Sequence, residues 1–203
     1  FAFSGDVLHV FISDVAAWVP RRSGVHAEAL RRVSTVYLPE GKLPMLPPAL
    51  ADGAASLLEG QDRPALCFAF ELGSDGAPVG FEVCEATIRV DRQLSYEEAS
   101  ALMASDGGGE VGALLRRAWE WMQRHKARRE LTGALTLSRS EVRVHVDEAG
   151  TVDIRRSEVT GGSRELVSEM MVATCAGTAT YCQDQQIPCI YRVQPRPHGL
   201  NPG

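Results

Sequence analysis

Glu169 stands in a sequence context that restricts what its carboxylate can do. It lies inside the apolar run Leu166 to Val172. An ionised carboxylate removed from water is costly in free energy unless another group compensates its charge. Glu169 therefore faces a cleft, where it is available for chemistry, or forms a structural ion pair, or points to solvent from an exposed helix face. The residue types alone leave these alternatives open.

Two other groups of side chains have the chemistry needed to contact nucleic acid. Tyr191 and Arg192 place an aromatic ring, on which a base can stack, next to a guanidinium that binds phosphate. Residues 124–129 hold four basic side chains at the end of a predicted helix. These form either a phosphate-facing patch or a solvated helix face.

Composition sets limits on all of these candidates. The chain has 203 residues, of which 44% are hydrophobic and 23% charged, as in globular proteins. The net charge of -5 excludes a basic footprint over the whole chain, so any contact with nucleic acid must be local. No apolar stretch is long enough for a membrane helix. The five cysteines form no Cys-x-x-Cys pair, and their odd number favours a reducing compartment.

Periodicity and turn residues predict an α+β fold with several hairpins and two substantial helices. Helices are expected over residues 25–32, 95–104, 111–129 and 163–181, the second of them capped by Ser95. Strands are expected over residues 7–12, 35–39, 65–72, 81–90, 141–146, 151–155 and 187–193. Residues 42–50 contain three prolines and are expected to form an irregular loop. Glu169 then belongs to a helix, and Tyr191 and Arg192 to the last strand.

Several ordered blocks of sequence resemble one known family over nearly the whole chain. The blocks are Phe11-Ile12-Ser13-Asp14-Val15-Ala16, Thr35-Val36-Tyr37-Leu38-Pro39, Pro44-Met45-Leu46-Pro47, Leu94-Ser95-Tyr96-Glu97-Glu98-Ala99, Glu169-Met170-Met171 and Ile187-Pro188 to Pro195. They are similar to the RNB domain, the catalytic domain of ribonuclease II and ribonuclease R type exoribonucleases. The last two blocks look most similar to its cyanobacterial and organellar branch. That branch implies a chloroplast or mitochondrion, or the cytoplasm if the source is bacterial.

The resemblance implies a fold, an activity and a cofactor. The expected fold is a partial RNB-like domain, a mixed β-sheet with packed helices. Residues 1–195 would be its central part, and residues 196–203 an irregular tail or a displaced piece of the same domain. The family hydrolyses single-stranded RNA from the 3′ end and releases nucleoside monophosphates. It uses Mg²⁺ ions held by a cluster of aspartates, which polarise the phosphate and activate a water.

Individual positions match residues that act in the family. Tyr37 matches a tyrosine that contacts the 3′-terminal nucleotides, and Glu169 matches a glutamate that helps to hold the terminal nucleotide. Tyr191 and Arg192 are further candidates for RNA contact. Leu137 stands near the place where several members have a phenylalanine that stacks on the RNA.

Two signatures of the family are absent from this chain. The metal cluster, roughly Asp-x-Asp-Asp, lies just before the strand that Val7 begins here, and neither Asp6 nor Asp14 matches one of its ligands. The arginine motif Thr-Ser-Pro-Ile-Arg-Arg is also missing. Two hypotheses follow. The chain is part of an exoribonuclease whose metal ligands lie elsewhere, or it is a catalytically inactive RNB-like module that serves as a structural or RNA-binding subunit of a larger ribonucleoprotein assembly.

Overall fold

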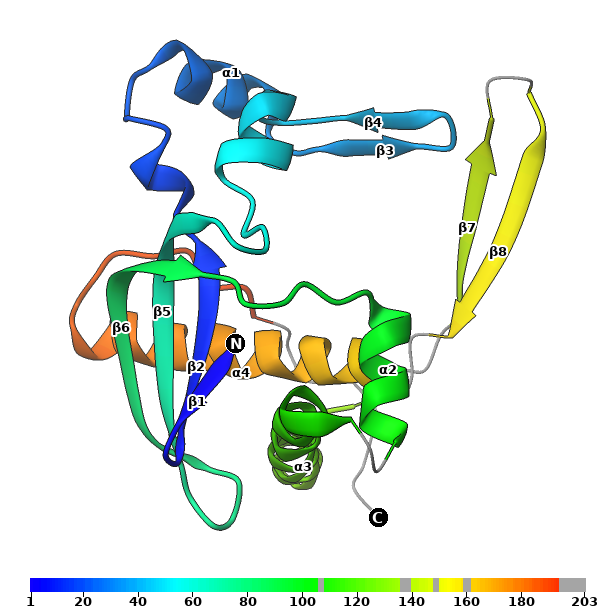
Figure 1. Cartoon of the computed structure of the whole chain (residues 1–203). Helices are drawn as coiled ribbons and strands as arrows, with labels where there is room; N and C mark the ends of the chain where they lie inside the picture. Colours follow the sequence, from blue (N-terminus) through cyan, green and yellow to red (C-terminus); the bar gives the residue numbers. More distant parts are fainter. Residues whose placement is uncertain (106–107, 136–139, 148–149, 159–161, 194–203) are drawn as a thin grey trace, which may run out of the picture.

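A four-stranded antiparallel sheet organises the first half of the chain (Figure 1). The computed structural model describes residues 1–105, 108–135, 140–147, 150–158 and 162–193. The strands are β1 (Ala2–Ser4), β2 (Val7–Ser13), β5 (Asp62–Leu72) and β6 (Pro78–Arg89), in the order β1-β2-β5-β6. Side chains alternate between the two faces of the sheet. Leu8 and Phe70, which lie opposite each other in register, are completely buried on the inner face.

Three helices cover the inner face of this sheet. They are α2 (Tyr96–Ala104), α3 (Gly109–Leu131) and α4 (Gly162–Asp184). Their apolar stripes meet the strands in one core of buried side chains, formed by Leu8, Val10, Phe68, Phe70, Ala99, Leu115, Ala118, Trp121, Met122, Leu166, Met170 and Ala173. Gly177 allows α4 to approach β6 closely, because a Cβ at this position would lie 2.4 Å from the ring of Phe81.

The remaining described elements extend away from this core. After β2 come η1 (Val15–Ala17), α1 (Gly24–Arg32), β3 (Val36–Leu38), β4 (Gly41–Leu43) and the π-helical turn η2 (Ala49–Ala54). Between α3 and α4 lies the hairpin of β7 (Ser140–Val146) and β8 (Val152–Glu158). The tip of the β3–β4 hairpin meets β7, where the Val146 amide donates to the Pro39 carbonyl over 2.9 Å (Figure 1).

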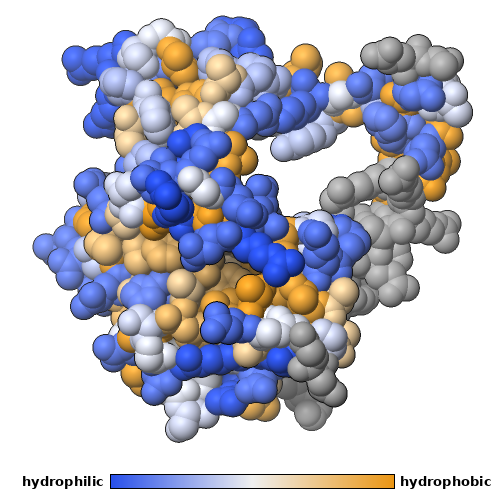
Figure 2. Space-filling view, viewed as in Figure 1, coloured by the Kyte–Doolittle hydropathy of each residue, from blue (hydrophilic) through white to orange (hydrophobic). Residues whose placement is uncertain are grey.

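Much apolar surface is exposed in the part of the chain that the structure describes. Figure 2 shows hydrophobic residues across the middle of one face and on the β7–β8 hairpin. That hairpin exposes Val142, Val144, Val152 and Ile154. None of the described helices has the length and hydropathy needed to cross a membrane.

The α+β fold and most of the predicted elements are confirmed. All four predicted helices form, and Ser95 with Glu98 makes a complete capping box at the start of α2. Residues 42–50 are less irregular than expected, because Gly41–Leu43 pairs with β3 and Ala49 begins η2.

The predicted strand over residues 187–193 is wrong. This segment is irregular and pairs with no strand among the described residues. Pro188 has no amide hydrogen to donate to a ladder, and Ile190 is fully exposed. The predicted tail, residues 196–203, lies outside the described residues.

Candidate functional site

Glu169 lies on the buried side of α4, next to the core. Leu166 and Met170 anchor this side of the helix against the sheet, and the spacing of 3.6 residues per turn carries Glu169 inward with them. Its exposed fraction is 7%. The guanidinium of Arg129 on α3 compensates the charge, since Nη2 donates to Oε1 over 2.5 Å and Nε donates to Oε2 over 3.3 Å. Of the three alternatives predicted for Glu169, the structure shows the ion pair.

His125 completes this cluster on α3, one helical turn before Arg129. Its Nδ1 lies 3.6 Å from Oε2 of Glu169, which is too long for a hydrogen bond, and this buried nitrogen has no partner among the described residues. The imidazole stacks on Trp121 with ring centroids 5.6 Å apart. Burial lowers the pKa of His125, the Arg129 guanidinium acts in the same direction, and Glu169 opposes both. The ring is therefore held in its neutral form more strongly than an ordinary histidine.

The basic end of α3 is neutralised within the molecule. Lys126 pairs with Glu165 of α4 over 2.6 Å, and Arg128 pairs with Asp75 of the β5–β6 turn over 2.5 Å. Together with Arg129, these side chains join α3 to two neighbouring elements. Arg124 and Arg128 remain exposed on α3, as predicted for a solvated helix face, whereas phosphate contact by residues 124–129 stays a prediction. The spacing within α3 does not show which acidic residues of other elements approach it.

Tyr37 lies on β3 and presents its ring to solvent, with an exposed fraction of 79%. It stands opposite Lys42 in the two-stranded ladder, and Lys42 in turn pairs with Asp52 of η2 over 2.6 Å. In Figure 1 the β3–β4 hairpin lies apart from the pair formed by α3 and α4. The structure therefore does not bring Tyr37 and Glu169 into one site, and the predicted RNA contact of Tyr37 stays a prediction.

Tyr191 and Arg192 follow α4 in the irregular segment and are both exposed. A hydrogen bond with Cys189 raises the pKa of Tyr191 to about 12, with burial acting in the same direction. These two residues are not held by a strand as expected, and their contact with RNA stays a prediction. Leu137 lies outside the described residues.

The described residues do not fit a magnesium cluster. Within them no three histidine, cysteine, aspartate or glutamate side chains gather in a way that could hold a metal ion. The two aspartates nearest the expected position have other partners. Asp6 pairs with Arg117 over 2.8 Å, and Asp14 caps η1 by accepting from the amides of Ala16 and Ala17.

Sequence reasoning missed Arg129, the ion-pair partner of Glu169, and its neighbour His125. His125 and Arg129 are four residues apart and share one face of α3, a spacing that was visible in the sequence. Glu169 belongs to another helix, 40 residues further on from Arg129, and only the packing of α3 against α4 brings it next to these two side chains.

Comparisons with known proteins all point to one family. The model of the RNB domain family matches residues 4–201. A Synechocystis protein described as an uncharacterized ribonuclease, sll1290, is 30% identical over 200 residues, which cover 97% of this chain and 29% of that protein. Ribonuclease R of Thermotoga maritima is 29% identical over 196 residues, which cover 94% of this chain and 28% of that protein.

A solved structure shows the same fold. Mycoplasma genitalium RNase R, in complex with double-stranded RNA, superposes with a TM-score of 0.86 and 27% identity, over 94% of this chain and 35% of that one. The chain thus spans less than a third of the length of the two relatives named above. The family model extends over nearly all of the sequence, and the chain accordingly belongs to the RNB domain family of ribonuclease II and ribonuclease R type exoribonucleases.

Proposed function

We propose that this chain is the central part of an RNB domain that hydrolyses single-stranded RNA from its 3′ end. The observation that carries the proposal is the match of the family model to residues 4–201, together with the similarity to an RNase R structure that contains RNA. In the proposed reaction a water adds to the terminal phosphodiester, the 3′-oxygen of the shortened RNA leaves, and a nucleoside 5′-monophosphate is released.

The family implies magnesium ions, and the described residues do not supply their ligands. We propose that these ligands belong to the family's aspartate cluster, which lies just before the strand that corresponds to β2. The sequence of the gene immediately upstream of Phe1 tests this placement. Aspartates in the pattern Asp-x-Asp-Asp support the enzyme, and a sequence without acidic residues there contradicts it.

Glu169 acts in this proposal by positioning Arg129. The carboxylate itself is too buried to touch RNA, whereas the Arg129 side chain is 29% exposed. Two of its nitrogens are bound by Glu169, so the plane of the guanidinium is fixed, and its Nη1 has no acceptor among the described residues. The Nη1 of a guanidinium held in this way can donate to a phosphate or ribose oxygen of the terminal nucleotide.

A second candidate function is a catalytically inactive module that binds RNA or supports an assembly. One observation favours it: Glu169 and Arg129 already satisfy each other, and the part of the chain described by the structure gathers no metal site around them. Under this hypothesis the cluster has only a structural role, and substitutions in it change stability without any activity to lose.

One experiment separates the two functions. The protein as its gene encodes it is incubated with uniformly labelled single-stranded RNA and Mg²⁺, and released nucleoside monophosphates are measured with and without a chelator. We expect magnesium-dependent release, which the Glu169→Gln variant lowers about tenfold or more, an effect of about 1.4 kcal/mol on the barrier.

The matched control is Glu165→Gln, which removes the neighbouring ion pair between α3 and α4 and should leave the rate within about twofold of wild type. RNA binding without any release supports the inactive module, and the absence of both overturns both functions.

A further inference from the structure

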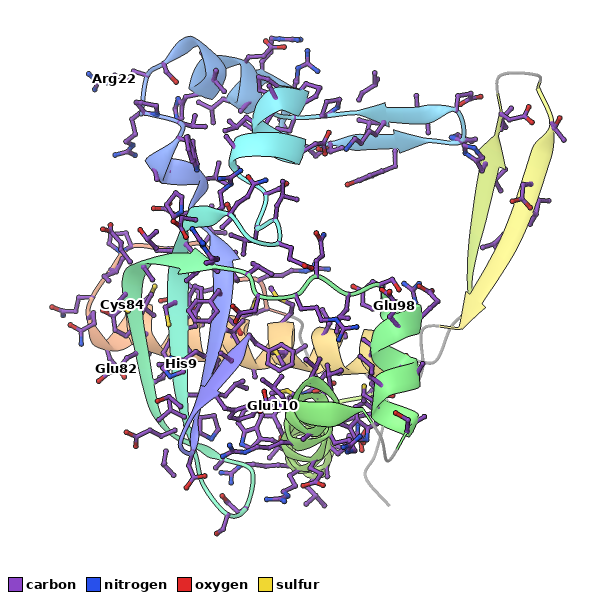
Figure 3. All side chains as sticks on the ribbon, in the orientation of Figure 1. His9, Arg22, Glu82, Cys84, Glu98 and Glu110 are labelled. Atoms are coloured by element: carbon purple, nitrogen blue, oxygen red, sulfur yellow. The ribbon has the colours of Figure 1, made fainter. Side chains whose placement is uncertain are left out.

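The loop that leads into α1 contains an open hollow that none of the residues discussed above lines. The hollow has a volume of about 490 Å³ and is lined by Arg21, Arg22 and His26. Figure 3 shows Arg22 at the outer edge of this loop, on the far side from the β3–β4 hairpin. Both arginines are exposed, and His26 is half-buried. Three nitrogen-rich side chains thus line one open hollow on the surface.

These arginines differ from most others in the described part of the chain, because no carboxylate accepts from them. At the other end of α1, Arg31 and Arg32 both pair with Glu28, over 2.7 and 2.6 Å. Further arginines are neutralised in the same way, in the pairs Arg89–Asp62, Arg117–Asp6, Arg128–Asp75, Arg129–Glu169 and Arg164–Glu97. In a chain of net charge -5, Arg21 and Arg22 leave a local positive site.

The backbone of the loop is held in a costly conformation at the same place. Arg22 has a φ of 67°, in the left-handed region that favours glycine. The following residue, Ser23, caps α1 by accepting from the amide of His26 over 3.2 Å. This cap fixes the turn and brings Arg21, Arg22 and His26 to one hollow. An arginine in this strained conformation makes the loop a candidate functional site.

We propose that this hollow binds the phosphodiester backbone of single-stranded RNA, an inference that rests on the proposed function. Guanidinium groups bind phosphate oxygens through paired N–H donors, and the imidazole of His26 adds a further donor. The ligand is the backbone rather than a base, because the lining offers donors for phosphate and no aromatic platform apart from the histidine. Binding is therefore independent of base sequence and weakens as salt is added.

The test measures binding of a fluorescent oligouridylate to the full-length protein, in a chelator so that no cleavage occurs, over about 50 to 200 mM salt. The variant Arg21→Gln/Arg22→Gln should bind about 25-fold more weakly near 0.1 M salt. The slope of log affinity against log salt should fall by about 1.4, as expected for two lost phosphate contacts on a single strand.

The matched control is Arg31→Gln/Arg32→Gln, which removes the same charge from the same helix at side chains that Glu28 already neutralises. Its affinity and slope should equal those of wild type. The single variant Arg22→Gly removes one guanidinium while relieving the backbone, so that weaker binding by this variant cannot come from misfolding. Inorganic phosphate at constant ionic strength should not displace the RNA.

Each other outcome overturns the inference in a recognisable way. Equal weakening by both double variants means that only overall charge matters. Displacement by inorganic phosphate means that the hollow binds a single phosphate group. Unchanged binding by Arg21→Gln/Arg22→Gln contradicts the RNA site in the hollow but leaves the proposed function intact. A wild-type protein that binds no RNA contradicts both the site and the proposed function.

Discussion

At the scale of single residues, the carboxylate of Glu169 is compensated from α3 while the nearby His125 nitrogen is not. A buried ion pair of this kind contributes less through its own attraction than through the penalty that appears when one partner is removed. The sequence context predicted that Glu169 needs compensation, but the identity of the partner depends on which helix packs opposite. A charged residue in an apolar run therefore indicates that an ion-pair partner exists, but not which residue it is.

The first prediction concerns removal of this carboxylate. Glu169→Ala should lower the free energy of unfolding by about 3 kcal/mol, because Arg129 then loses its partner in a mostly buried position. Urea denaturation followed by circular dichroism measures the change. Asp62→Ala is the control, since its pair with Arg89 is 60% exposed on both sides and should be worth less than about 1 kcal/mol. Equal effects of the two substitutions would contradict the importance of burial here.

The second prediction concerns pH. Because the pKa of His125 is lowered in the folded protein, the unfolded chain takes up a proton at a higher pH than the folded protein does. The free energy of unfolding should therefore decrease as the pH falls through the ordinary histidine value of about 6.5, and should level off below the lowered pKa.

Urea denaturation at about pH 8 and about pH 5.5 checks this behaviour. The His125→Gln variant cannot titrate at this position and should lose less stability over the interval than wild type. His145→Gln, a substitution of an exposed histidine, should behave as wild type. A loss in His125→Gln as large as that of wild type would assign the pH dependence to other groups.

At the scale of elements, the sequence pattern correctly predicted those helices and strands that local interactions determine. The β5–β6 hairpin and the capped helix α2 are encoded in alternation, turn residues and Ser95, all within a few positions of one another. The prediction of a strand over residues 187–193 was wrong because a strand depends on a non-local partner. The apolar residues of this segment satisfy the strand pattern, but a strand also needs a neighbouring ladder, and the described residues offer none.

The contact between α4 and β6 gives the third prediction. Gly177→Ala should destabilise the protein by about 1–3 kcal/mol, although alanine favours a helix by about 1 kcal/mol. The added Cβ would lie 2.4 Å from the Phe81 ring, and Phe70 packs against that ring edge to face at 4.9 Å, so moving the ring would disturb this packing.

Thermal unfolding of Gly177→Ala and of the control Gly24→Ala measures this effect. Gly24 opens α1, and a Cβ there would meet no atom within 4 Å, so the control should be as stable as wild type or slightly more stable. A stabilised Gly177→Ala variant would show that the two elements are less tightly packed than described.

At the scale of the whole molecule, the distribution of charge matters more than its sum. The net charge of -5 predicted that contact with a polyanion must be local. Pairing among the described residues sharpens this statement, because the basic end of α3 is neutralised while Arg21 and Arg22 are not. The sequence indicated that a polyanion could bind only at a local site. The location of that site depends on which arginine and lysine side chains pair with acidic residues in the fold.

Among the described residues, the backbone hydrogen bond from Val146 to Pro39 joins the two projecting hairpins, and this contact has a kinetic consequence. Breaking one bond that is close to solvent exposes little new surface, so the hairpins should separate often while the core remains intact. The Val146 amide then exchanges its hydrogen through this local opening, on a far shorter timescale than the Phe70 amide, which waits for unfolding of the central sheet. Hydrogen–deuterium exchange followed by NMR resolves both amides, and equal protection would mean that the hairpins and the core open as one cooperative unit.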